Sequence, residues 1–277
     1  MLSYQHAYHA GSPADLHKHV ALAVLLTPLA GRGALYVESH AGRGLYDLSS
    51  PEAAKTGEAA EGLGRLVEAL PDGPPDGSFW DVLLALRARD GGTAYPGSPA
   101  LAASLFQPGD RVLLHERHPA EHRTLLRARG RLDAHGRGRR GALIEISSED
   151  GHDALRGLHP GARPGLALID PSYEVKAEYR QAADAMIALV EAWPAGIVML
   201  WYPILPAGRH GAMAETVMRA LGRRVVRHEA PYRNPPTRGM SGSGLLIAGL
   251  DDTMVDAVAT AWRPLSPVLL DAPLSFG

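Results

Sequence analysis

The sequence predicts an α/β fold with a seven-stranded, mostly parallel sheet and a small helical insertion. Two observations support this prediction. Short apolar runs alternate along the chain with segments of helical pattern, which is typical of parallel sheets whose strands are joined by helices. Several of these runs end in a glycine turn, an acidic residue or an Asp-Pro pair, as strands do where an open α/β sheet binds a ligand. The 277 residues suffice for one large domain with an insertion.

The composition excludes several classes of protein. The chain has no cysteine, so it has neither a disulfide framework nor a thiolate metal site or nucleophile. Because its formal net charge is −2, any nucleic acid must be held by a local patch. The longest apolar run, residues 20–30, is broken by Thr27 and Pro28 and is too short to span a bilayer. Asp15 and several histidines precede it, which is unlike a signal peptide, and we expect a cytoplasmic protein.

The first predicted helix covers about residues 13–29. Residues 12–15, Ser-Pro-Ala-Asp, combine an N-cap, a proline at the first helical position and an acid that can close a capping box. Lys18 and His19 fall in the second turn, where a cation gains nothing from the helix dipole. On this segment alone, pairing of Lys18 with Asp15 and solvation of His19 are favoured over a partner elsewhere.

The first predicted strand, residues 34–39, ends in a glycine turn at 40–44 with the sequence His-Ala-Gly-Arg-Gly. Such a turn lets a cofactor approach the backbone closely. The full dinucleotide fingerprint needs a third glycine, which is missing because Leu-Tyr-Asp follows at 45–47. A plain strand-to-helix turn is therefore the alternative.

After this turn the sequence pattern changes from that of a strand to that of helices. Helical patterns lie around residues 58–70 and 79–90, with a Pro/Gly-rich link at 71–77 between them. We expect a main domain formed by residues 1–47 and 96–277, and a helical insertion subdomain at 48–95.

The next three predicted strands end in candidate site residues. The strand at 111–116 ends in Glu116, where an acid can accept hydrogen bonds from ribose hydroxyls. The strand at 142–146 is followed by Asp150 and Gly151. The strand at 165–169 runs into Asp170-Pro171-Ser172-Tyr173, so Asp170 lies at a strand's carboxyl end. Taken alone, this stretch is equally consistent with an ordinary Asp-Pro-Ser turn. The last three strands are predicted at 196–202, 223–228 and 244–250.

A basic stretch separates the second and third strands. A solvated helix face with an exposed loop is favoured there over phosphate contact, because runs of charge are usually solvated. Its arginines are Arg123, Arg127, Arg129, Arg131, Arg137, Arg139 and Arg140.

Together these features resemble the Rossmann-like fold of class I S-adenosylmethionine-dependent methyltransferases. Residues 170–173 resemble the D-P-P-Y signature of enzymes that methylate exocyclic amino groups, chiefly adenine N6. A closer similarity, to the RlmJ-type 23S rRNA adenine-N6 methyltransferases, extends over nearly the whole chain. The matching blocks, in order, are residues 1–6, 9–11, 14–15, 18–19, 40–44, 95–99, 170–174 and 200–203.

The resemblance implies methylation of the N6 amino group of one adenine in 23S rRNA, with S-adenosylmethionine as the cofactor. It implies no metal, no membrane partner and a monomer. The catalytic residues would be Asp170, Pro171 and Tyr173. Residues implied to bind the cofactor are His19, His40, Ser98, Glu116, Asp150, Gly151 and Asp170; those implied to contact the RNA are Tyr4, His6, Lys18 and Tyr173.

The chemistry explains these residue types. The lone pair of an adenine amino group is delocalised into the ring, so the nitrogen is a poor nucleophile. The Asp170 carboxylate and the Pro171 carbonyl can each accept one N–H and so orient the nitrogen toward the methyl group. Tyr173 would stack on the base, which must first be unstacked from its neighbours. Ser172 replaces the second proline of the signature, which removes a restraint on this loop.

Three other functions are compatible with parts of the sequence. A DNA adenine or a glutamine amide could be the methyl acceptor, although the N-terminal block disfavours this. An inactive RNA-binding protein on the same fold is a second alternative, and Ser172 and the near-neutral charge motivate it. A nicotinamide oxidoreductase is disfavoured by the missing third glycine.

Overall fold

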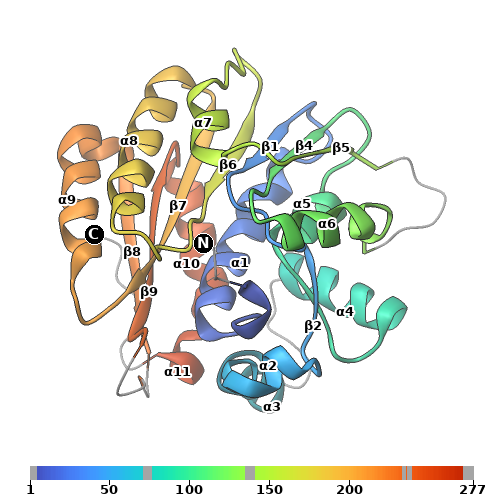
Figure 1. Cartoon of the computed structure of the whole chain (residues 1–277). Coiled ribbons are helices and arrows are strands. Elements are labelled where there is room, and N and C mark those ends of the chain that lie inside the picture. The colour runs from blue at the N-terminus through green and yellow to red at the C-terminus, as the bar shows by residue number, and fades with distance from the viewer. Residues whose placement is uncertain (1–4, 71–76, 135–140, 233–234, 236–238, 271–277) are drawn as a thin grey trace.

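The computed structural model describes residues 5–70, 77–134, 141–232, 235 and 239–270. A seven-stranded sheet lies at its centre (Figure 1), with the strands β1 (Leu35–Glu38), β4 (Arg111–His115), β5 (Leu143–Ser147), β6 (Gly165–Ile169), β7 (Gly196–Ile204), β8 (Val225–Pro231) and β9 (Gly242–Ala248). Their order is β5-β4-β1-β6-β7-β9-β8. The first five run parallel, and β9 is antiparallel to β7 and β8. The prediction of a seven-stranded, mostly parallel sheet is confirmed.

The direction in which strands are added reverses at β1. The chain places β4 and β5 on one side of β1, and then β6 and β7 on the other. In open α/β sheets such a reversal leaves a crevice at the carboxyl ends of the strands, where ligands bind. The glycine turn at 40–44 follows β1, and Asp170 follows β6, so both predicted motifs lie at this reversal.

Helices cover both faces of the sheet (Figure 1). Each face has its own apolar core, because both sides of a mostly parallel sheet must be shielded from water. One core includes residues of α1 (Pro13–Leu26), α4 (Ser78–Asp90), α5 (Ser98–Leu105), α6 (Pro119–Ala128), α10 (Asp252–Trp262) and α11 (Ser266–Leu269); the other includes residues of α7 (Gly151–Arg156), α8 (Ala177–Ala192) and α9 (Arg209–Leu221). None of the helices in the described ranges combines the length and apolar character needed to cross a membrane.

The side chains of strand β1 contribute alternately to the two apolar cores. Leu35 and Val37 belong to the core shared with α8, whereas Tyr36 belongs to the core shared with α1. Since side chains alternate along a strand, Glu38 lies on the same face as Tyr36. This acidic side chain is fully buried. Strand alternation therefore places a carboxyl group on the α1 side of the sheet, just before the glycine turn.

The segment expected to be an insertion packs onto the main core. It contains α2 (Pro51–Thr56), a π-helical turn (Ala60–Gly64), α3 (Arg65–Ala69) and α4. At the two ends of this segment, where the chain leaves and re-enters the main domain, β2 (Leu45–Asp47) and β3 (Ala94–Pro96) form a two-stranded antiparallel sheet. The sequence analysis did not predict this sheet. Leu63, Leu66 and Leu83 share a core with α1 and α5. We retain 48–95 as a proposed boundary for this subdomain.

Asp110 fixes the loops that lead into β1 and β4. Its Oδ2 accepts hydrogen bonds from the backbone N–H groups of Gly31, at 2.7 Å, and Gln107, at 2.8 Å. Its Oδ1 accepts one from Ala34 at 2.8 Å. The Asp110 side chain is fully buried, and so is its bond to Ala34, which water cannot replace. Because β1 and β4 carry the glycine turn and Glu116 at their far ends, Asp110 helps to set the geometry of the ligand-binding edge.

Asp110→Ala is expected to lower the free energy of unfolding by about 2 kcal/mol or more, because the buried N–H of Ala34 and the part-buried N–H groups of Gly31 and Gln107 lose their acceptor. Urea denaturation followed by circular dichroism measures this. Asp256→Ala, at an exposed position on α10, is the matched control and should change stability by less than about 0.5 kcal/mol. Equal stability of the two variants would contradict the role given to Asp110.

Candidate active site

A cavity of about 280 Å³ opens at the carboxyl ends of β1, β4 and β6. It brings together most of the residues predicted from the sequence, although they come from segments far apart in the chain. Gly151 and Tyr173 do not line it, and Tyr4 lies outside the described residues. The predicted residues that line it are His6, Lys18, His19, His40, Ser98, Glu116, Asp150, Asp170 and Pro171.

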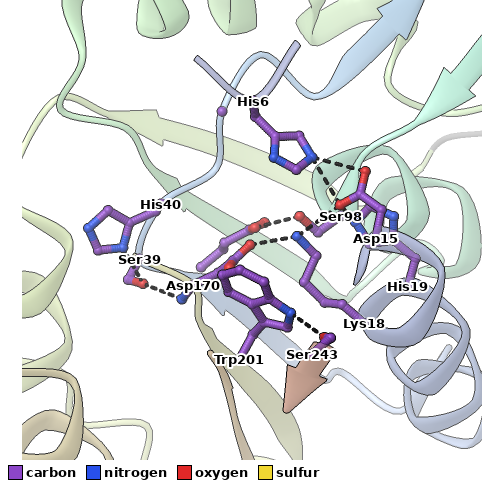
Figure 2. A network of polar contacts seen from close by, with 12 residues as sticks. His6, Asp15, Lys18, His19, Ser39, His40, Ser98, Asp170, Trp201 and Ser243 are labelled. Carbon is purple, nitrogen blue, oxygen red and sulfur yellow. Dashed lines mark hydrogen bonds and ion pairs between the residues drawn. The ribbon is translucent and has the colours of Figure 1, made fainter. Parts of the chain in front are cut away.

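The central contact of the cavity is an ion pair between α1 and the end of β6. The Lys18 Nζ donates to Asp170 Oδ2 at 2.6 Å and lies 3.3 Å from Asp15 Oδ1 (Figure 2). Lys18 therefore has the local partner that the helix register predicted and a second one, 152 residues away. Burial alone would lower the pKa of Lys18, but Asp170 and Asp15 together raise it above its ordinary value. Lys18 is thus a buried, permanently charged ammonium.

Asp15 connects this ion pair to the N-terminal segment. Its carboxylate accepts from the Nε2 of His6 and from the backbone N–H of Gly11, each at 3.0 Å. Burial would raise the pKa of Asp15, yet its electrostatic interactions with His6, His19 and Lys18 and its hydrogen bond from His6 hold it well below its usual range. The ionised Asp15 thus joins His6 to Lys18 and aligns both toward the cavity.

Glu38 is a buried carboxyl group that the sequence analysis did not select. The hydroxyl of Ser98 donates to its Oε1 at 2.5 Å, and the hydroxyl of Tyr36 donates to its Oε2 at 2.8 Å. Burial, together with the negative charge of Asp170, raises the pKa of Glu38 to about 8, although the two hydrogen bonds oppose this. The available signal was an acid at the end of an otherwise apolar strand, a position that requires partners.

His19 presents a neutral imidazole to the cavity. Its Nδ1 lies 2.9 Å from the hydroxyl of Tyr95, whereas its buried Nε2 has no hydrogen-bond partner among the described residues. Burial lowers the pKa of His19 to about 3, so the ring is uncharged at neutral pH. A buried ring nitrogen without a partner is costly unless a ligand supplies one. His19 was favoured as a solvated residue on local pattern alone, and that interpretation is wrong.

At the other end of the cavity, Glu116 connects the glycine turn after β1 to the loop after β4. Its Oε2 accepts from the N–H of Gly42, and its Oε1 accepts from the N–H of His118, both at 2.7 Å. These bonds hold the turn after β1 against the loop after β4. Each carboxylate oxygen can accept a second hydrogen bond, so Glu116 still has the capacity to bind hydroxyl groups of a ligand.

Asp150 and His40 complete this end. Asp150 caps α7 by accepting from the N–H groups of His152 and Asp153, and it pairs with Arg117 at 2.7 Å. The ring of His40 lies edge-on to that of His152, 5.1 Å away, and burial lowers the pKa of His40 to about 3. The resulting wall is aromatic and largely uncharged, with carboxylates at its border, which suits a nucleoside.

Gly151 contributes by its lack of a side chain. A Cβ at this position would collide with the backbone carbonyl of Ser39, at the end of β1. Only glycine therefore allows α7 to begin so close to β1. This contact supports the position of Asp150, one residue earlier, although Gly151 itself does not line the cavity.

Tyr173 packs behind the cavity. It has a φ of 57° and is the only non-glycine residue with a positive φ in the described part of the chain. Its hydroxyl donates to the carbonyl of Trp201 at 2.6 Å, and its ring lies 4.5 Å from that of Tyr179. Strained backbone of this kind concentrates at functional sites. The side chain of Tyr173 thus anchors the loop that bears Asp170 on the side facing away from the cavity.

Comparison with known proteins finds a matching family model and similar sequences. A model of the family described as "Ribosomal RNA large subunit methyltransferase D, RlmJ" matches residues 31–272. The chain is 33% identical over 254 residues to "Ribosomal RNA large subunit methyltransferase J" of Haemophilus influenzae, covering 89% of this chain and 86% of the relative. The protein of the same name from Escherichia coli is 32% identical over 252 residues, with the same coverage.

A solved structure shares the fold over nearly the whole chain. Protein LPL1258 of Legionella pneumophila superposes with a TM-score of 0.80 at 27% identity, and the match covers 97% of each chain. Relatives above 30% identity over most of both chains, together with a family model that spans residues 31–272, identify the family. The chain therefore belongs to the RlmJ family of ribosomal RNA large subunit methyltransferases.

Proposed function

We propose that this protein transfers the methyl group of S-adenosylmethionine to the N6 amino group of an adenine in 23S rRNA. The observation that carries the proposal is the position of Asp170, which follows β6 at the strand reversal and points into the cavity beside Pro171. Family membership supports RNA of the large ribosomal subunit as the substrate. The family resemblance of residues 170–173 supports an exocyclic amino group as the acceptor.

The residues at the β1 and β4 end fit the cofactor. Glu116 retains free acceptor capacity for ribose hydroxyls, and the His40 wall suits an adenine ring. The unpartnered Nε2 of His19 and the hydroxyl of Ser98 lie where polar groups of the same ligand can reach them. When bound, S-adenosylmethionine supplies a methyl group carried on a positively charged sulfur. The protein residues hold this group in place and exclude water from it.

Asp170 is suited to orient the amino group. Lys18 holds its Oδ2, whereas its Oδ1 has no hydrogen-bond partner among the described residues. A carboxylate can only accept hydrogen bonds, and Asp170 lines the cavity. We propose that Oδ1 accepts one amino N–H, that the Pro171 carbonyl accepts the other, and that the nitrogen lone pair is thereby aimed at the methyl group. The carboxylate also stabilises the positive charge that develops on nitrogen.

Tyr173 is proposed to support this loop. Stacking on the base, the role implied by the family resemblance, would require the ring to leave its packing against Tyr179 and its bond to Trp201. In its observed position, the side chain instead fixes the turn that directs Asp170 and Pro171 into the cavity. His6 and Lys18 lie at the same end of the cavity as Asp170, and we propose that they border the bound nucleotide.

The test of this function is methyl transfer to purified nucleic acids. The protein is incubated with methyl-labelled S-adenosylmethionine and either protein-free 23S rRNA or duplex DNA of matched length. We expect label in the rRNA, and mass mapping should locate it as N6-methyladenosine at one position. Label in DNA alone, or no transfer despite cofactor binding measured by calorimetry, would contradict the proposal.

Asp170→Asn tests the acceptor role without a change of shape. The single-turnover rate of RNA methylation should fall by about 100-fold or more, because an amide bears no charge to stabilise the developing cation. The dissociation constant for S-adenosylmethionine and the melting temperature should change far less. A variant with the wild-type rate would show that Asp170 does not hold the reacting group.

Glu38→Gln tests the protonation state of the buried acid. In the folded protein the pKa of Glu38 is about 8, above its ordinary value of 4.5, so the folded state binds this proton more tightly than the unfolded state. Its contribution to stability is present below about pH 4.5 and is lost as the pH rises toward 8.

The free energy of unfolding of the wild type, minus that of Glu38→Gln, should therefore decrease by up to about 1.4 kcal/mol per pH unit between pH 5 and 8. Urea denaturation at three pH values in this interval measures it. A difference that stays constant with pH would mean that Glu38 is ionised in the folded protein.

A further inference from the structure

A second depression lies outside the cavity, between the first turns of α8 and α9. These helices pack side by side (Figure 1), and the groove between them has a volume of about 330 Å³. Three cationic side chains line it, namely Lys176, Arg180 and Arg209, whereas Asp184 is its only acidic residue. All three cations are exposed, and none forms an ion pair with another described residue.

The groove and the active-site cavity share a wall. Val175, Ala177 and Glu178 line the cavity, and Lys176 and Tyr179 of the same segment line the groove. The segment begins five residues after Asp170, and Tyr179 contacts the ring of Tyr173. This segment separates the cavity from the groove. If one unit of a polymer is bound in the cavity, the adjacent units can therefore reach the groove by passing over this segment.

The charge of the groove selects for an anionic polymer. The three side-chain cations stand at the first turns of two helices, whose N-termini add partial positive charge. The basic stretch predicted from the sequence differs: Arg123 and Arg127 lie on α6, and Arg137, Arg139 and Arg140 lie outside the described residues. Arg129 donates to the carbonyl of Ile144, and Arg131 pairs with Asp90 at 3.1 Å. In the groove the guanidinium and ammonium groups remain available for a ligand.

We propose that this groove binds the phosphodiester backbone of the rRNA beside the target adenine, through Lys176, Arg180 and Arg209. The inference rests on the proposed function, because it takes the base in the cavity as its anchor. Backbone contacts hold the register of a nucleic acid without reading its sequence. The groove thus supplies the local positive patch that a protein with a formal net charge of −2 needs in order to hold RNA.

The test compares Arg180→Ala/Arg209→Ala with wild type, leaving Lys176 intact because its neighbours line the cavity. The matched control is Arg219→Ala, an exposed arginine on α9 about 15 Å further along the helix axis and outside the groove. Binding of a 23S rRNA fragment is measured by fluorescence anisotropy at several salt concentrations, and S-adenosylmethionine binding by calorimetry.

We expect the double variant to bind the RNA several-fold more weakly, and the slope of log affinity against log salt to fall by about 2, one for each lost phosphate contact. Cofactor affinity, melting temperature and the position of the methylated adenine should match wild type. Arg219→Ala should have an unchanged slope.

An unchanged slope in the double variant would overturn the groove proposal while methylation by the wild type still stood. An equal loss in Arg219→Ala would overturn it as well, because the effect would then be one of overall charge. If the wild type neither bound nor methylated rRNA, the proposed function itself would be contradicted. The groove proposal, which depends on a base bound in the cavity, would then be contradicted with it.

Discussion

The buried ion pair between Lys18 and Asp170 is the contact on which the site depends. It is possible because α1 is enclosed on nearly all sides. Three consecutive residues of α1, each rotated by about 100°, bind three different elements: His17 reaches Ser243 on β9, Lys18 reaches the end of β6, and His19 reaches Tyr95 on β3. The helix thus contacts two strands on the same side of β1 and the strand β3 at the end of the insertion, and the ammonium of Lys18 lies where these elements meet.

Such a cluster must balance its charges, since an uncompensated buried charge would cost several kcal/mol. Lys18 lies close to two carboxyl groups, those of Asp15 and Asp170. An ionised carboxylate at Glu38, which is fully buried, would add a further negative charge beside them. The proton retained by Glu38 avoids this, and His6 adds a hydrogen bond to Asp15. The raised pKa of Glu38 is therefore a consequence of its burial first, to which the nearby Asp170 adds.

The sequence was sufficient for the positions of the seven strands along the chain and for most of the residues that line the cavity, because apolar runs and the residues at their ends are local signals. It was insufficient where a residue's role depends on distant partners. Lys18 and His19 were ambiguous because a helix enclosed on all sides has no polar face from which burial can be inferred. Glu38 was missed because its partners, Ser98 above all, come from another segment. The β2–β3 pair was missed because three-residue strands carry little pattern.

The loop after β6 shows how a departure from the family signature can be accommodated. A proline at 172 would restrict the backbone directly. Here Ser172 lies 3.5 Å from Glu178, which also accepts from the N–H of Val175, so the first turn of α8 holds the loop instead. Tyr173, whose backbone is in the left-handed conformation, anchors the loop by its contacts with Trp201 and Tyr179. The loop is therefore fixed by contacts with α8 and β7, and the same contacts determine which of its residues face the cavity and which face the groove.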